Sequence, residues 1–292
     1  VQNRMGIGDM VIFLPFIQAI SKKFEVPVSL LVKENSKAIQ FLKNNSAIDE
    51  IIILDRGSKI RGGTHNGIVG SYNLIKHIKK FNFDKVFIFN SSLRYNLIVR
   101  GAGIKDIHQY PLFQKKNQHI INAAKIFLKK ELGLQVESDP KILINDQLIM
   151  DAKSKYKIDS KEINILLGIG GSGPTKRIPA KIFIDFMKLA TQKYNCKFFL
   201  ATGKNIEEQK ILLEILNTCY KDKCYALDNL SLNEILPIIK NCNISICNDS
   251  SFSHLSSGLG VKTIVLMSDT PLLYGSYSPR MYPIIPDGEN IV

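Results

Sequence analysis

The 292-residue sequence has no hydrophobic run long enough to cross a bilayer. Its longest purely apolar runs, such as residues 11–16 and 51–54, fall far short of the roughly 20 residues that a membrane-spanning helix needs. A basic start followed by an apolar stretch and a small-residue cleavage site is also missing, so the sequence shows no signal peptide. The chain opens at Val1 without a methionine, and we expect the natural N-terminus to lie before this residue.

Cysteine is scarce, with five residues that form an odd set confined to the second half of the chain. This pattern is unlike a disulfide framework, so we expect free thiols and a reducing, cytoplasmic compartment. Two pairs have four intervening residues, Cys219 with Cys224 and Cys242 with Cys247, which is loose spacing for zinc and favours buried thiols. No histidine and carboxylate cluster and no Ser-His-Asp pattern is visible in the spacing, so the sequence predicts no metal and no cofactor.

The composition is that of a globular protein, with 45% hydrophobic and 22% charged residues. A chain of this length exceeds what one hydrophobic core usually supports, so we expect two domains. The net charge of +13 is uneven, because residues 1–150 carry 22 Lys and Arg against 12 Asp and Glu, whereas residues 151–292 carry 17 against 14. A basic first half favours an anionic partner, such as nucleic acid, an anionic membrane face or a phosphorylated substrate. A Lys-rich solvated surface is the alternative.

Short β-branched and aromatic runs alternate with longer amphipathic stretches, which is typical of βα units around a parallel sheet. In the first half the pattern predicts strands at 28–32, 50–54, 85–89 and 106–109, and helices at 10–24, 36–44, 68–80, 93–100 and 118–132. In the second half it predicts strands at 163–167, 197–201, 224–227, 244–247 and 263–267, and helices at 179–194, 206–217, 231–240 and 251–259. The polar segment 137–162 is predicted to be a linker. We therefore expect two doubly wound α/β domains that face each other, over residues 1–145 and 160–292, with ligands beyond the carboxyl ends of their strands.

The first turn that could carry chemistry opens the first helix with Gly6-Ile7-Gly8-Asp9. Gly6 and Gly8 let the backbone approach a ligand closely, and a carboxylate at a helix start is electrostatically favoured. An ordinary capping role for Asp9 is the structural alternative. Pro15 follows about two turns later, so we expect the helix either to kink there or to begin again at Leu14.

The second turn, residues 168–177, follows a predicted strand and precedes the helix predicted from Pro179. Its four glycines expose backbone amides, and Lys176 and Arg177 add two adjacent cations, so the turn is suited to an anion. It matches G-x-G-x-x-G formally, but no acidic residue ends the next strand, where a dinucleotide's ribose would need one. The Walker pattern fails because Pro174 stands where that motif has its lysine.

The third turn, residues 248–251, follows another predicted strand. Asp249 and Ser250 can cap a helix whose free amides point at a ligand, and His254 falls within the first turns of that helix. A capping cluster without a ligand is the alternative. Residues 258–260 then form a tight return to the next strand, which packs this helix against the sheet.

In this order and at these distances, the three turns resemble glycosyltransferase family 9, the ADP-heptose lipopolysaccharide heptosyltransferases. Gly8-Asp9 before an apolar run is similar to the family's opening motif, residues 171–179 to its central loop, and residues 248–250 with His254 to its donor-site motif. The likeness covers nearly the whole chain. It departs at Ser251, where the family commonly has a glycine.

The resemblance implies a GT-B fold, in which two facing Rossmann-like domains bind acceptor in the first and donor mainly in the second, with transfer in the cleft between them. It implies inverting, metal-independent transfer of a sugar, heptose from ADP-heptose, to a lipopolysaccharide core or related glycolipid. Carried over by position, Asp9 matches the general base and Lys176 the cation that neutralises the departing diphosphate. The donor-binding residues would be Ser172, Gly173, Thr175, Thr202, Gly203, Asp249, Ser250, Ser251 and His254, while Gly6 and Gly8 would allow close approach of the acceptor.

The expected partners are a nucleotide-sugar donor and an anionic glycolipid acceptor. We also expect peripheral contact with the inner membrane face, because an anionic surface attracts the basic first half of the chain. Nucleic acid is not expected, because no base-stacking or groove-reading motif is present. Two alternatives stay open: an acceptor-independent sugar-nucleotide enzyme such as an epimerase, and a catalytically silent nucleotide-sugar-binding protein.

Overall fold

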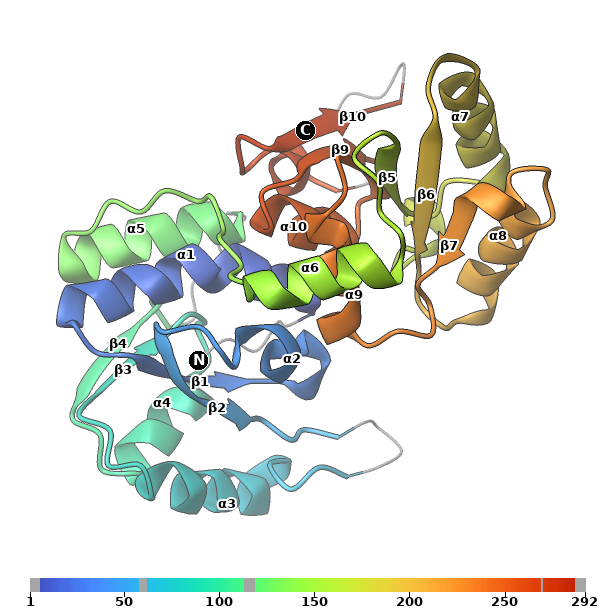
Figure 1. The fold of residues 1–292 in the computed structure, drawn as a ribbon. Coiled ribbons are helices and arrows are strands. Elements are labelled where there is room, and N and C mark those ends of the chain that lie inside the picture. The colour runs from blue at the N-terminus through green and yellow to red at the C-terminus, as the bar shows by residue number, and fades with distance from the viewer. Residues whose placement is uncertain (1–5, 58–61, 113–118, 269, 287–292) are drawn as a thin grey trace. The chain divides into compact units, whose positions relative to one another are not determined.

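The computed structural model describes residues 6–57, 62–112, 119–268 and 270–286 (Figure 1). The chain divides into two compact units, residues 1–137 and residues 138–292. Both are built from alternating strands and helices, as the sequence predicts. In the described part of the chain, no helix is both long enough and apolar enough to cross a membrane.

Unit 1 contains four strands that pair as two parallel ladders, β1 with β2 and β3 with β4. Its elements are α1 (Ile7–Phe24), β1 (Val28–Val32), the 3-10 turn η1 (Glu34–Ser36), α2 (Ala38–Leu42), β2 (Ile48–Ile53), α3 (Gly67–Lys79), β3 (Lys85–Ile88), α4 (Leu93–Gly101), β4 (Asp106–Gln109) and α5 (Ile120–Leu132). All nine predicted elements are present, with ends within three residues of the predicted ones. Gln118, the predicted first residue of the last helix, lies outside the described residues.

Helix α1 runs without interruption past Pro15, so the predicted restart at Leu14 is wrong. A proline inside a helix costs about 3 kcal/mol or more through a lost hydrogen bond and a steric clash. The neighbouring side chains offset this cost, because Phe13, Leu14 and Phe16 are each at most 2% exposed. Burying one such side chain contributes about 1.5–3 kcal/mol. Packing therefore holds the helix together at the point where local propensity opposes it.

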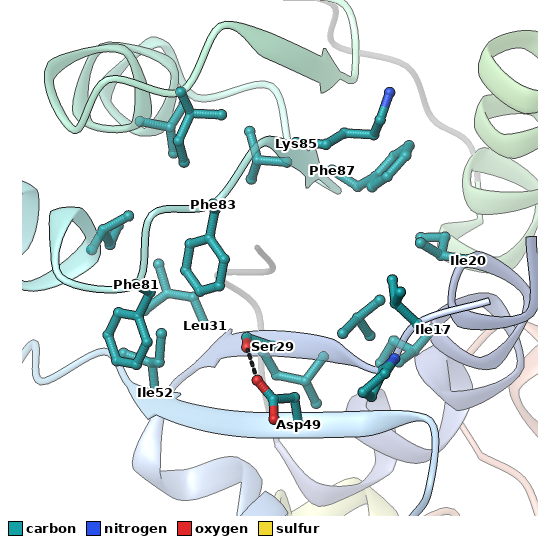
Figure 2. A pocket seen from close by; sticks show the side chains of 18 of the residues that line it. Ile17, Ile20, Ser29, Leu31, Asp49, Ile52, Phe81, Phe83, Lys85 and Phe87 are labelled. Atoms are coloured by element: carbon teal, nitrogen blue, oxygen red, sulfur yellow. Dashed lines mark hydrogen bonds between the residues drawn. The ribbon is translucent and has the colours of Figure 1, made fainter. Parts of the chain in front are cut away.

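A cavity of about 620 Å³ lies between the two ladders of unit 1, against α1 (Figure 2). β1 lines one side of it and β3 another, and Ile17 and Ile20 of α1 contribute to its wall. The lining is mostly apolar, and the polar pair Ser29 and Asp49 is joined by a 3.4 Å hydrogen bond.

Unit 2 is built on a parallel sheet of six strands in the order β10-β9-β8-β5-β6-β7. Its elements are α6 (Asp146–Lys155), β5 (Ile163–Gly168), η2 (Pro174–Lys176), α7 (Ala180–Lys193), β6 (Cys196–Ala201), α8 (Ile206–Leu216), η3 (Lys221–Lys223), β7 (Cys224–Ala226), α9 (Leu232–Lys240), β8 (Ile244–Asn248), α10 (Ser251–Gly258), β9 (Lys262–Leu266), η4 (Leu272–Gly275) and β10 (Met281–Ile284). This is the doubly wound order, with β5 first and central.

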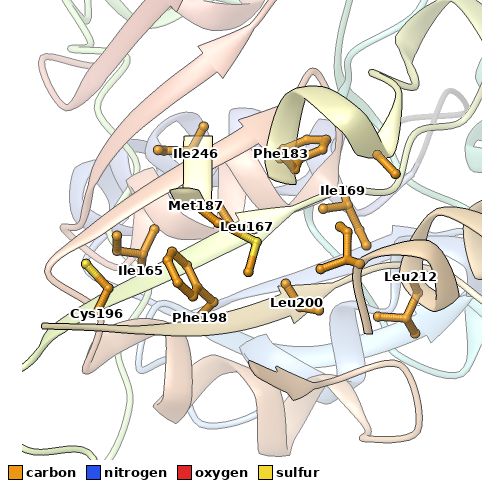
Figure 3. Close-up of a cluster of buried hydrophobic side chains, with 12 residues drawn as sticks. Ile165, Leu167, Ile169, Phe183, Met187, Cys196, Phe198, Leu200, Leu212 and Ile246 are labelled. Atoms are coloured by element: carbon orange, nitrogen blue, oxygen red, sulfur yellow. The ribbon is translucent and has the colours of Figure 1, made fainter. Parts of the chain in front are cut away.

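The core of unit 2 lies between the sheet and the helices α7 and α8 (Figure 3). Leu167 and Phe198 of the central strands and Met187 of α7 are fully buried there. The strands are near-continuous apolar runs because a parallel sheet covered by helices has no wet face. Fixing β5 in this core also fixes the loop that leaves its carboxyl end.

Two elements of unit 2 were not predicted. Helix α6 lies inside the segment 137–162 that the sequence predicts as a linker, and Asn145 caps it by accepting a 2.8 Å hydrogen bond from the Gln147 N–H. The side chain of Asn241 donates to the Ile149 carbonyl at 2.9 Å, which ties α6 to unit 2. Strand β10 lies at the edge of the sheet and contains Pro283, a residue that argues against a central strand and is tolerated at an edge.

Candidate functional site

The second and third sequence motifs lie at the same point of the unit 2 sheet. The chain leaves β5 toward β6 on one side and later returns to β8 on the other, so the strand order reverses between β5 and β8. In open parallel sheets, ligands bind outside the carboxyl ends of the strands at this reversal. The loop 169–179 leaves β5 there, and the short turn 249–250 leaves β8.

An ion pair joins these two loops. The Nζ of Lys176 lies 2.7 Å from Oδ2 of Asp249, and the side chains are 22% and 4% exposed respectively. The Thr270 hydroxyl donates to the same carboxylate oxygen. A buried carboxylate is stable only when it is paired and hydrogen-bonded. Asp249 therefore holds the Lys176 cation at the place where an anionic ligand would arrive.

Asn248, the last residue of β8, connects the end of this strand with the loop that follows β5. Its buried side-chain amide donates to the Ile169 carbonyl at 2.9 Å and to the Gly170 carbonyl at 3.3 Å. These contacts join the end of β8 to the start of the loop after β5. The start of the loop after β5 is thus held by hydrogen bonds to the end of β8.

The turn after β6 forms a third side of the site. Glu208, 7% exposed in the first turn of α8, accepts a 2.7 Å hydrogen bond from the Gly171 N–H. Asn205 caps the same helix and also accepts a hydrogen bond of 3.4 Å from Arg177. Of the two acidic residues here, Glu207 is exposed and pairs with Lys210, so Glu208 is the one directed at the glycine loop. Sequence patterns could not separate these neighbours.

Three buried polar atoms of this site have no hydrogen-bond partner among the described residues: Thr202 Oγ1, Asn248 Oδ1 and Ser250 Oγ. An unpaired buried polar atom costs about 1–3 kcal/mol, and such atoms are rare in native proteins unless a ligand or water serves them. Thr202 lies on the turn after β6, Asn248 is the last residue of β8, and Ser250 lies on the turn after β8. Their clustering favours a polar ligand at this edge of the sheet.

His254 lies on α10 behind the turn 249–250 and is 5% exposed. Its Nδ1 lies 2.9 Å from the Tyr277 hydroxyl, and the two rings are stacked with centroids 5.6 Å apart. Burial raises the pKa of Tyr277, so its hydroxyl stays protonated over the physiological range. Tyr277 was not predicted as a site residue, because no motif connects it with His254.

The remaining predicted donor residues lie on the same loops. Ser172 and Thr175 are exposed, and Gly173 is the extended residue before the η2 turn that carries Lys176. Ser251 is the first residue of α10, and Gly203 packs against the Glu208 carboxylate. The structure thus brings all nine predicted donor-binding residues to one region of unit 2.

Asp9, Gly6 and Gly8 belong to unit 1. Helix α1 begins at Ile7, three residues before the predicted start, so Gly8 and Asp9 lie in its first turn. Oδ2 of Asp9 accepts a hydrogen bond of 3.0 Å from the Gly6 N–H. Asp9 therefore caps the helix by reaching back from the third helical position, a variant of the capping alternative stated above. Its carboxylate is half-buried at the start of α1.

The cavity of unit 1 is separate from the predicted chemistry, since none of the predicted site residues lines it. In the described ranges there is no group of three or more His, Cys, Asp or Glu side chains arranged for a metal ion. All five cysteines are free thiols. The prediction of buried thiols is wrong for Cys219, which is exposed, while burial raises the pKa of Cys247 to about 12.

The glycine loop predicts a sharp difference between two substitutions. A Cβ at Gly171 would lie 2.7 Å from the backbone carbonyl oxygen of Lys176, whereas a Cβ at Gly173 meets nothing closer than Thr175 Oγ1 at 3.8 Å. Gly171→Ala should therefore destabilise the protein by about 1–3 kcal/mol through overpacking. Gly173→Ala is the matched control, with an expected change within about 0.5 kcal/mol. Urea unfolding of both variants tests this, and equal midpoints would show that the loop is not packed as described.

Fold and site together define an α/β protein with a cluster of glycine-rich and cation-bearing loops at the switch point of a doubly wound sheet. The sequence model of glycosyltransferase family 9 (heptosyltransferase) matches residues 72–286. The chain therefore belongs to glycosyltransferase family 9, and it is a heptosyltransferase by family.

Individual relatives agree with this assignment. The chain is 23% identical over 309 residues to lipopolysaccharide heptosyltransferase 1 of Campylobacter coli, and the alignment covers 98% of this chain and 88% of that protein. Among solved structures, E. coli ADP-heptose LPS heptosyltransferase II is similar with a TM-score of 0.75 and 14% identity, covering 97% of this chain and 88% of that one. E. coli heptosyltransferase WaaC with ADP gives a TM-score of 0.71 and 13% identity, covering 98% and 92%. These likenesses show the GT-B type of fold.

Proposed function

We propose that this protein transfers heptose from ADP-heptose to a lipopolysaccharide core or related glycolipid, with inversion at the sugar carbon and without an essential metal. The observation that carries the proposal is the Lys176–Asp249 pair at the switch point of a family 9 heptosyltransferase. The names of the relatives support ADP-heptose as donor and lipopolysaccharide as acceptor. We further propose that residues 1–145 bind the acceptor and residues 160–292 the donor.

The departing group is a nucleoside diphosphate, whose oxygens gain negative charge as the bond to the sugar breaks. Lys176 and the backbone amides of the loop 169–179 would stabilise this charge more strongly than the ground state, which is what accelerates a reaction. Asp249 holds the Lys176 cation through a 2.7 Å hydrogen bond, so the fold itself sets the position of this charge. These groups supply the positive charge that a metal ion provides in other transferases.

The acceptor hydroxyl is a weak nucleophile near neutral pH, so a nearby carboxylate that accepts its proton should raise the rate about 10²–10⁴-fold. We assign this role to Asp9. Attack from the face opposite the diphosphate gives inversion.

The donor is assigned to the three turns of unit 2. The unpartnered buried atoms of Thr202, Asn248 and Ser250 would find hydrogen-bond partners in the nucleotide sugar. Backbone groups and hydroxyls of the loops after β5 and β6 contribute further contacts, at Ser172, Gly173, Thr175 and Gly203. The turn after β8 and the start of α10 contribute Asp249, Ser251 and His254. Glu208 joins this set because its carboxylate lies against Gly171 and Gly203.

The direct test is the release of ADP from ADP-heptose, which should require the acceptor. ADP should also raise the unfolding midpoint more than UDP, GDP or NAD at the same concentration. A ligand at 100 times its Kd stabilises the folded state by about 2.7 kcal/mol. Equal stabilisation by all four nucleotides would argue against ADP-heptose as donor, and acceptor-independent turnover would argue against transfer.

Two other outcomes have their own signatures. An epimerase would convert the donor alone into an isomer, which product analysis without acceptor detects. A catalytically silent binding protein would be stabilised by ADP yet give no product with any acceptor. We propose a cytoplasmic location with peripheral contact at the inner membrane face, where a glycolipid acceptor is found.

A further inference from the structure

Five large hydrophobic side chains are exposed on helices α3 and α4 of unit 1. Ile68 is 90% exposed, Val69 73%, Tyr72 56%, Leu93 41% and Leu97 58%. Single exposed hydrophobic residues are normal on protein surfaces, but a group of them on adjoining elements marks an interaction site. We refer to these five residues as the α3–α4 patch.

The patch is one continuous surface because its two helices are neighbours on the same core. Leu74 of α3 and Ile98 of α4 are buried in a single cluster. Arg94 of α4 donates to the Ser71 hydroxyl at 3.0 Å and to the His65 carbonyl, which joins the starts of the two helices.

The patch residues occupy the outward positions of these helices. Ile68 and Tyr72 are one turn apart on α3, and Leu93 and Leu97 are one turn apart on α4. Because the helices are packed and joined, the five side chains are presented without any rearrangement.

Lysines lie beside the patch on α3. Residues 62–105 contain seven Lys and Arg against a single acidic residue, Asp84. Lys76 and Lys79, both exposed, lie on the same outward side of α3 as Tyr72, and Nζ of Lys76 lies 4.6 Å from the centre of the Tyr72 ring. An apolar surface with a basic rim fits the headgroup region of an anionic bilayer, where apolar side chains insert and cations meet phosphates.

The patch also lies at the carboxyl edge of the unit 1 strands. α4 starts shortly after β3 ends, and hydrogen bonds between Asp55 and His65 hold the start of α3 beside the end of β2, so Ile68, Val69 and Leu93 lie toward the carboxyl edge of these strands. α1 ends three residues before β1 begins and runs back along it, so Asp9 in its first turn lies toward the same edge.

We propose that the α3–α4 patch docks unit 1 onto an anionic phospholipid surface. Its use rests on the proposed function, since docking at this edge would hold a membrane-bound glycolipid acceptor near Asp9. The docking itself requires only the patch and the lipid.

The test is flotation of the protein with vesicles of about 30% phosphatidylglycerol in phosphatidylethanolamine, compared with vesicles of phosphatidylcholine alone. The double variant Ile68→Ser/Leu97→Ser should lower the partition coefficient on anionic vesicles by about tenfold or more, because two inserted aliphatic side chains are lost. Lys76→Ser/Lys79→Ser should lower it by a similar factor at low salt and by less at about 0.5 M salt, where charges are screened. Both variants change exposed side chains, so the fold should be retained.

A control variant removes two exposed aliphatic residues from unit 2, where Ile182 is 53% and Leu189 61% exposed on α7. Ile182→Ser/Leu189→Ser should bind anionic vesicles like the parent protein. Equal loss in control and patch variants, or equal binding to phosphatidylcholine, would overturn the proposal. So would a patch variant that converts a dimer into a monomer in light scattering, because the patch would then be covered by a second copy.

Membrane docking through the patch and heptosyl transfer can be tested independently of each other. ADP release with an acceptor stripped of its acyl chains measures transfer without a membrane. Patch variants that keep this activity but lose vesicle binding support the docking surface. A parent protein that binds vesicles through the patch yet transfers no heptose would overturn the proposed function and leave the docking surface standing.

Discussion

Asp9→Asn is expected to reduce kcat for heptosyl transfer by about 10²–10⁴-fold, the range that a positioned general base contributes. Asparagine has the same shape, and its carbonyl oxygen can still accept the hydrogen bond that Asp9 receives from the Gly6 N–H. The start of α1 should therefore keep its cap. ADP binding, which we assign to unit 2, should be unchanged in a thermal shift measurement.

Asp9→Ala separates chemistry from structure. It should lose the same transfer activity and, in addition, about 0.5–2 kcal/mol of stability, because the capping contact disappears as well. The pH dependence provides a further readout, since the parent rate should fall at acidic pH as the base becomes protonated and the residual rate of Asp9→Asn should not. An Asp9→Asn variant with near-parental turnover would show that Asp9 serves only the helix.

The secondary structure was predictable because its signals are local. The second-half strands and helices predicted from periodicity match the observed ones to within one residue, as β5 illustrates. Both misses depend on contacts that local patterns do not show. α6 is polar on most of its surface and is stabilised by contacts with α9 far along the chain, such as the one from Asn241. β10 contains Pro283 and is a strand only because β9 offers it an edge.

The sequence indicates which residue types form the site, but it does not show which of these residues contact one another. A glycine-rich turn with adjacent cations indicates an anion site from sequence alone, and a capped helix start does the same. The Lys176–Asp249 pair joins residues 73 positions apart, and no pattern in either turn shows that one holds the other. Tyr277 was missed for the same reason, because it comes beside a motif only when the sheet places it there. Glu207 and Glu208 both lie near the turn after β6 in the sequence, and only the structure separates them.

Lys176→Met should produce the second large effect, a fall in kcat/KM of about 10²–10³-fold, which is the usual cost of removing one group that stabilises charge in the transition state. The same substitution should destabilise the ligand-free protein, because it leaves the Asp249 carboxylate, 4% exposed, without its cation. Removing one partner of a buried pair costs more than removing both. The double variant Lys176→Met/Asp249→Asn should therefore recover part of the lost stability while remaining inactive.

A double-mutant cycle measured by urea unfolding quantifies this coupling, for which we expect about 1–3 kcal/mol. Lys188→Met, at an exposed position of α7, is the matched control and should change neither stability nor turnover. Additive effects in the cycle would mean that Asp249 and Lys176 are neighbours without mutual stabilisation. In that case the cation would not be ordered before the donor binds, and much of the catalytic effect assigned to Lys176 would have to come from the loop amides instead.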